Sequence, residues 1–76
     1  MEEKVREILS EVSGVSLSEI RADTRLVGDL GMSSFDLADL IVSVEEACDI
    51  RIPDARFPEM ETVEDVVRII REEIVQ

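Results

Sequence analysis

The stretch GDLGMSSFDLADLIVSVEEA, Gly28–Ala47, decides the fold, because a polar opening is followed by apolar residues at helical spacing. It predicts a helix that begins at Ser33 or Ser34 and ends near Asp49. At about 100° per residue, the apolar side chains fall on one face, which we expect to lie in the core: Leu37, Leu40, Ile41, Val44 and Cys48. The opposite face is polar and acidic, with Asp36, Asp39, Ser43 and Glu46.

A narrow third stripe on the same helix lies outside the main core arc. Phe35, Ala38 and Val42 follow one another at positions i, i+3 and i+7. If the stripe is exposed, it forms an apolar docking strip on the surface. The alternative is that it packs beneath the segment that precedes the helix. For Phe35 the pattern favours neither alternative.

Two further segments have the spacing of amphipathic helices. Gly14 ends the first, Glu2–Val12, whose apolar face comprises Val5, Ile8, Leu9 and Val12. Thr62 is predicted to cap the second, with Asp65 at the capping-box position three residues later. The apolar stripe of this last helix comprises Val63, Val66, Val67, Ile70 and Ile74.

The connections between these helices differ in character. Ser13–Met32 has no sustained period, but its apolar residues predict an ordered loop anchored to the core: Val15, Leu17, Ile20, Leu26 and Leu30. Ile52-Pro53 ends the second helix region, and Asp54–Met60, which contains Pro58, has room for one short helical turn. We therefore predict an all-α fold in one domain, residues 1–76: a small four-helix bundle of three main helices and one short helix.

Composition limits the partners of this chain. Its 19 acidic and 8 basic side chains give a net charge of −11, which repels nucleic acid and anionic lipid and attracts basic surfaces. Because Cys48 is the single cysteine, an intrachain disulfide is excluded. Its place on the apolar face predicts that its side chain is a small buried hydrophobe and not a reactive thiol. Without an apolar run near 18 residues or a signal-peptide pattern at Met1–Val5, we expect a cytoplasmic monomer with no membrane insertion.

Residue types that commonly act in catalysis are scarce in this sequence. The chain has no His, no Tyr and one Lys, so the usual general bases and activators of a nucleophile are missing, and we predict that it is not an enzyme. Catalysis by carboxylates alone is the least favoured alternative. Asp23–Ser34 has Gly28 at the sixth place of a calcium loop, but Arg25, Val27 and Ser34 occupy ligand positions, so no metal site is predicted.

The two serines at the start of the central helix have different predicted roles. Ser33 suits an N-cap, with Asp36 three residues on to complete a capping box. Ser34 then occupies the first helical position, with its hydroxyl directed to solvent beside the positive end of the helix dipole. Such a position suits a phosphodiester.

The string LVGDLGMSSFDLADLIVSVEEACDIRIPD, Leu26–Asp54, resembles the acyl carrier protein family. The matching residues are Leu26, Asp29, Leu30, Gly31, Ser34, Asp36, Asp39, Leu40, Glu45, Glu46, Ile52, Pro53 and Asp54, and the likeness continues through Thr62-Val63. The resemblance implies a four-helix carrier whose Ser34 bears 4′-phosphopantetheine, taken from coenzyme A. In that family acyl groups are bound to the thiol of the arm as thioesters, so the resemblance implies a protein that delivers biosynthetic intermediates and catalyses nothing.

The resemblance also implies partners. These are a phosphopantetheinyl transferase and acyl- or ketosynthase-type enzymes with basic surfaces, bound through the central helix. The family's recognition helix maps onto Asp36, Asp39, Glu45 and Glu46 with Ala38 and Val42. Ser33 stands where the family has Asp and Phe35 where it has Leu, so both belong to the recognition set and favour a carrier specialised for one pathway. The alternative is a carrier-like module that is not modified and acts as an acidic docking subunit.

Overall fold

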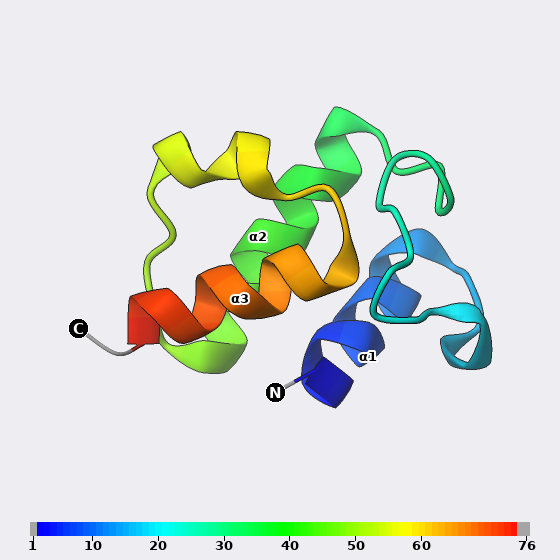
Figure 1. Ribbon diagram of the computed structural model, residues 1–76, viewed down its shortest axis with the longest axis horizontal. Helices are drawn as coiled ribbons and strands as arrows, with labels where there is room; N and C mark the ends of the chain where they lie inside the picture. The colour runs from blue at the N-terminus through cyan, green and yellow to red at the C-terminus, as the bar shows by residue number, and fades with distance from the viewer. Residues whose placement is uncertain (1, 75–76) are drawn as a thin grey trace.

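Helices make up most of the chain in the computed structural model, which describes residues 2–74. The α-helices are α1 (Glu2–Ser13), α2 (Ser34–Cys48) and α3 (Val63–Ile74), and the 3-10 helices are η1 (Leu17–Glu19) and η2 (Asp54–Glu59). Helix α1 packs against both α2 and α3, and the α1–α2 connection covers one end of the bundle, on the right in Figure 1. The predicted all-α bundle is confirmed, with η2 as its short helix. None of the helices in residues 2–74 has the length and apolar character that crossing a bilayer requires.

The core follows the predicted apolar face of α2 in its central turns. Leu40, Ile41 and Val44 are buried. Leu37 and Cys48 are only partly buried, so the prediction of a buried Cys48 is wrong in degree. These two residues lie in the first and last turns of the helix, where fewer neighbouring segments cover a side chain.

Helix α3 is buried over a different arc from the one its pattern predicted. Ile69 lies outside the predicted stripe but is fully buried, because α1 and residues 22–26 both lie against α3. Ile74 is 47% exposed, so its prediction as a core residue is wrong: it is the last residue of the helix and extends past these neighbours. The predicted capping box is confirmed, since Thr62 Oγ1 accepts from Asp65 N at 3.3 Å and Asp65 Oδ2 accepts from Thr62 N at 3.0 Å.

Side chains from the connection between α1 and α2 reach the core, as predicted. Ile20 and Leu26 are fully buried. Arg6 of α1 holds the first part of the connection, because its guanidinium donates to the backbone carbonyls of Leu17 and Ile20 at 2.9 and 2.7 Å. The remaining predicted anchors are partly buried: Val15, Leu17 and Leu30.

The second part of this connection is bonded to the residues that lead into α3. Leu26 N donates to Glu61 O at 2.9 Å, and Val63 N donates to Thr24 O at 3.1 Å. An isolated antiparallel β-bridge lies at the same place. These bonds satisfy backbone groups that a buried loop would otherwise leave unpaired. The connection before Ser34 is therefore held by Arg6 of α1 in its first part and by residues 61–63 in its second part.

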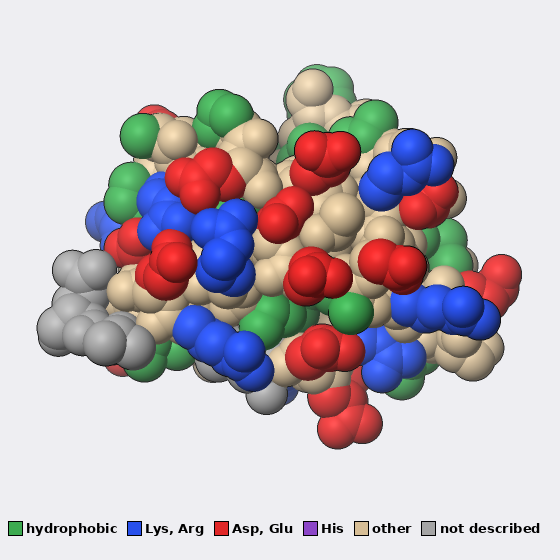
Figure 2. Space-filling model, in the orientation of Figure 1, with side chains coloured by type: hydrophobic (Ala, Val, Ile, Leu, Met, Phe, Trp, Pro, Cys, Tyr) green, Lys and Arg blue, Asp and Glu red, His purple; other side chains and the backbone are tan. Residues whose placement is uncertain are grey.

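A network of charged side chains around Arg56, here called the Arg56 network, fastens η2 to α3. The Arg56 guanidinium contacts Glu59 at 3.0 Å, Glu73 at 3.2 Å and also Glu72, and Arg68 contacts Glu59 at 3.3 Å. Its hydrogen bonds with Glu59 and Glu72 raise the pKa of Arg56, and the bonds from Arg56 and Arg68 lower the pKa of the Glu59 carboxyl. Figure 2 shows this face, where basic side chains lie among acidic ones over η2 and α3. The network holds η2 against α3.

Candidate functional site

Ser33 caps α2, as predicted. Its Oγ accepts a hydrogen bond from Asp36 N at 3.3 Å, and Asp36 Oδ2 accepts one from Ser33 N at 2.9 Å. The pair forms a capping box, which satisfies two backbone donors at the helix start. Gly31 precedes it with a φ of 66°, a left-handed conformation that a side chain disfavours. The Ser33 hydroxyl is thus already hydrogen-bonded to the backbone at the start of α2.

Ser34 is the first residue of α2, and its side chain is exposed. Within residues 2–74 its hydroxyl has no hydrogen-bond partner. It lies at the positive end of the helix dipole, where unsatisfied backbone amides favour a negatively charged group. The arrangement leaves this hydroxyl open to modification by a phosphate-bearing reagent.

An apolar hollow opens beside Ser34, between α2 and η2. Its volume is about 230 Å³, and we call it the serine-end hollow. The side chains that line it are Ser34, Leu37, Ala38, Ile41, Phe57 and Met60. A flexible arm attached to Ser34 would therefore begin at the edge of an apolar surface.

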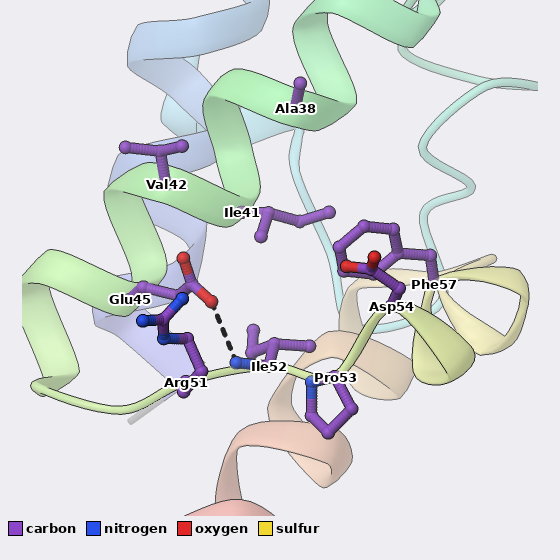
Figure 3. A pocket seen from close by; sticks show the side chains of 9 residues that line it. All are labelled: Ala38, Ile41, Val42, Glu45, Arg51, Ile52, Pro53, Asp54 and Phe57. Atoms are coloured by element: carbon purple, nitrogen blue, oxygen red, sulfur yellow. Dashed lines mark hydrogen bonds between the residues drawn. The ribbon is translucent and has the colours of Figure 1, made fainter.

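A second hollow continues along the same two helices. It has a volume of about 420 Å³, and we call it the distal hollow. Its lining, drawn in Figure 3, comprises Ala38, Ile41, Val42, Glu45, Arg51, Ile52, Pro53, Asp54 and Phe57. Figure 3 shows Ile41 of α2 and Phe57 of η2 pointing toward one another. The two hollows share Ala38, Ile41 and Phe57 as a common wall.

The third stripe of α2 is exposed. Phe35 is 84% exposed, Val42 is half-exposed and Ala38 lies on the surface between them. The alternative that the stripe packs beneath the preceding loop is wrong, because residues 24 and 26 of that loop are bonded to the start of α3 and not laid across α2. Ser34 is thus adjacent to an apolar strip that is open to solvent.

The acidic side chains of α2 are not equivalent. Asp39 and Glu46 are exposed, whereas Asp36 and Glu45 are partly buried. Asp36 belongs to the capping box, and Glu45 Oε2 accepts a hydrogen bond from Ile52 N at 2.8 Å, the dashed line in Figure 3. Glu45 therefore ties the end of α2 to the segment that forms the distal hollow. The sequence carried no local signal for this bond, because its partners lie seven residues apart across a chain reversal.

Replacing Glu45 by Ala is expected to lower the free energy of unfolding by about 1–2 kcal/mol, since the Ile52 amide loses a charged acceptor. Glu46→Ala removes an equal charge from the exposed neighbour and should change it by less than about 0.5 kcal/mol. Urea denaturation followed by circular dichroism measures both. Equal losses for the two variants would contradict a structural role for Glu45.

Comparisons with known proteins identify the family. The sequence model of the phosphopantetheine attachment site matches residues 3–70. Over 69 residues the chain is 36% identical to an acyl carrier protein from Clostridium acetobutylicum, covering 91% of this chain and 90% of that protein. The chain belongs to the acyl carrier protein family. An acyl carrier protein from Akkermansia muciniphila is 39% identical over 70 residues, covering 92% of this chain and 88% of its own length.

Two solved structures share the fold of this acyl carrier protein family member. The crystal structure of an acyl carrier protein from Thermotoga maritima is 28% identical, with a TM-score of 0.80 over 99% of this chain and 93% of that one. The solution structure of the apo doublet acyl carrier protein from prodigiosin biosynthesis is 24% identical, with a TM-score of 0.80 over 93% of this chain. The chain spans 34% of that doublet, and the likeness to it supports the fold alone.

The residues of this carrier fit the cofactor of its family, 4′-phosphopantetheine. Ser34 offers an exposed hydroxyl at the positive end of a 15-residue helix, with an apolar hollow beside it. The acidic and apolar residues predicted for recognition lie on α2, the helix that Ser34 begins. Sequence reasoning missed Phe57 and Met60, which complete the hollow from η2 and its end, because no local pattern shows which helix a 3-10 segment will face.

Proposed function

We propose that Ser34 carries a 4′-phosphopantetheine arm, on which this protein holds biosynthetic intermediates and delivers them to partner enzymes. The observation that supports this most directly is the unpaired Ser34 hydroxyl at the start of α2, beside an apolar hollow. When bound, the arm supplies a terminal thiol that forms thioesters with acyl groups. The chain itself supplies the hydroxyl nucleophile, its position and an acidic docking surface.

The partner of the first step is a phosphopantetheinyl transferase. Ser34 has no base of its own among the described residues, so the transferase must bring coenzyme A, the metal ion and the proton acceptor. The capping box contributes by holding the helix end rigid while the hydroxyl points outward. The carrier therefore needs no catalytic residue.

The test is the intact mass of the protein after incubation with coenzyme A, magnesium and a broad-specificity phosphopantetheinyl transferase. Addition of one phosphopantetheine unit is the expected result. No addition with several transferases would contradict the carrier role and favour the second candidate, a docking subunit that stays unmodified. That candidate rests on Ser33, which stands where the family has Asp.

The proposed docking surface is the outer side of α2. It combines acidic side chains with the exposed stripe: Ser33, Phe35, Asp36, Ala38, Asp39, Val42, Glu45 and Glu46. With a net charge of −11, the chain attracts basic surfaces, and exposed charges give association rates that fall as salt rises. Because Asp36 and Glu45 bond to backbone amides, Asp39 and Glu46 are the acids left for a partner.

Charge reversal at Asp39 should weaken binding to the cognate transferase or synthase by about threefold to tenfold at low salt, because an exposed ion pair becomes a repulsion. The loss should shrink as salt rises. Glu11→Lys makes the same charge change on the exposed surface of α1 and should leave binding nearly unchanged. Titration by surface plasmon resonance at two salt concentrations measures this, and equal effects of the two reversals would contradict a docking role for α2.

Ser33→Asp restores the residue that the family has before the modified serine. The melting temperature should stay within about 1–2 °C, because Ser and Asp are near-equal caps. Modification by a general transferase should become faster, because a negative charge returns beside the attachment point. Initial rates from intact mass measure the change, and equal rates would remove the support for a carrier dedicated to one pathway.

A further inference from the structure

We propose that Phe57 sets the length of the acyl group that this protein shelters, an inference that rests on the proposed attachment at Ser34. The serine-end hollow of about 230 Å³ and the distal hollow of about 420 Å³ lie in line between α2 and η2. Phe57 lines both of them. The acyl group is carried at the end of the arm attached to Ser34, and one that enters the groove from the serine-end hollow therefore meets the Phe57 ring before it reaches the distal hollow.

Phe57 is the wall residue best placed to divide the groove. The other shared side chains are Ala38, which is too small to block the path, and Ile41, which is 8% exposed and belongs to the core. Phe57 is 37% exposed and points from η2 toward Ile41 across the gap between the helices. The Phe57 ring is the large group at the junction of the two hollows, and removing it should disturb the packing of the core very little.

The backbone beneath Phe57 is held in place. The preceding residue, Arg56, is bound by the carboxylates of the Arg56 network, and Met60 N donates to Phe57 O at 3.0 Å. Opening the groove by moving η2 away from α3 would break the contacts of Arg56 with Glu72 and Glu73. The ring itself is therefore the element that limits the path.

The chemistry on the two sides of Phe57 matches this role. Besides Phe57, the serine-end hollow is lined by aliphatic side chains and Met60, with Ser34 as its polar edge. The distal hollow carries Glu45, Arg51 and Asp54 among its lining residues. An aliphatic chain that passed Phe57 would exchange an apolar lining for one that contains charged groups, so short aliphatic acyl groups are the cargo that the resting structure favours.

The experiment loads Ser34 with butanoyl, octanoyl and dodecanoyl arms from the corresponding acyl-coenzyme A, in wild type, Phe57→Ala and Phe35→Ala. Loading is driven to completion and checked by intact mass, and the melting temperature is measured for each form. Each buried CH₂ stabilises the folded state, so the melting temperature rises by a few degrees for each one that the groove accepts. In wild type the rise should stop at short chains, and in Phe57→Ala it should continue to octanoyl or beyond.

Phe35→Ala is the matched control, because it removes the chain's other Phe ring from an exposed site on α2 that lines neither hollow. It should show the chain-length dependence of wild type. The same dependence in Phe57→Ala as in wild type overturns the proposal, whereas failure of loading by mass overturns the attachment at Ser34. Phe57→Leu keeps part of the side chain and should give an intermediate limit, which tests the inference if Phe57→Ala is poorly folded.

Discussion

Ser34→Ala abolishes the addition of phosphopantetheine, whereas Ser33→Ala leaves it intact: this is the outcome we expect from intact mass after incubation with a broad-specificity transferase. Ser34 has an exposed hydroxyl with no partner among the described residues. The Ser33 hydroxyl is already bonded to Asp36 N at 3.3 Å. Substitution of one serine should therefore abolish modification, and substitution of its neighbour should leave modification intact.

The two substitutions should have the opposite order in stability. Ser33→Ala removes a cap worth about 1 kcal/mol and should lower the melting temperature by about 4–8 °C. Ser34→Ala changes an exposed first-turn residue and should leave it nearly unchanged. Incubation well below both melting temperatures keeps folding out of the comparison. Addition of phosphopantetheine to Ser34→Ala, or its loss in folded Ser33→Ala, would contradict the assignment of the attachment to Ser34.

Leu26→Ala is expected to cost about 2–5 kcal/mol of unfolding free energy, because it empties a fully buried position. Small domains have a total of about 5–15 kcal/mol, so the variant should lose a large fraction of its stability. Leu26 lies in the loop before Ser34, and its backbone is bonded to Glu61. The expected loss measures how far this loop belongs to the core.

Val27→Ala is the matched control, because Val27 is the next residue in the loop and is 57% exposed. Its unfolding free energy should stay within about 0.5 kcal/mol of wild type. Urea denaturation has to be followed by far-ultraviolet circular dichroism, since the chain has no Trp and no Tyr. Similar losses at both positions would mean that the loop is not anchored as the structure describes.

Features set by neighbouring residues could be predicted from the sequence. Helical spacing predicted the three α-helices, and both capping boxes followed from a Ser or Thr with an Asp three residues later. Ser33 as cap and Ser34 as first helical residue came from the same local rule. Local rules succeed here because a helix forms its backbone bonds within one turn.

Features that depend on distant segments could not be predicted. Whether Phe35 is exposed depends on where the preceding loop lies, and that loop is bonded to residues 61 and 63. Ile74 has the right spacing for the core but extends past the segments that cover α3. The Glu45 bond to Ile52 and the place of Phe57 in the groove likewise arise from chain reversals, which helical periodicity does not encode.

The pairing of the Ser34 loop with the start of α3 has a consequence for synthesis on the ribosome. Leu26 N donates to Glu61 O, and Thr24 O accepts from Val63 N, so these partners lie 35 and 39 residues later in the chain. Contacts of such sequence separation form late, because the intervening chain must first be closed. A nascent chain that has passed Ser34 but not residue 61 presents the serine without its supporting loop. Attachment of the arm should therefore follow translation of α3 and should not compete with the growth of the chain.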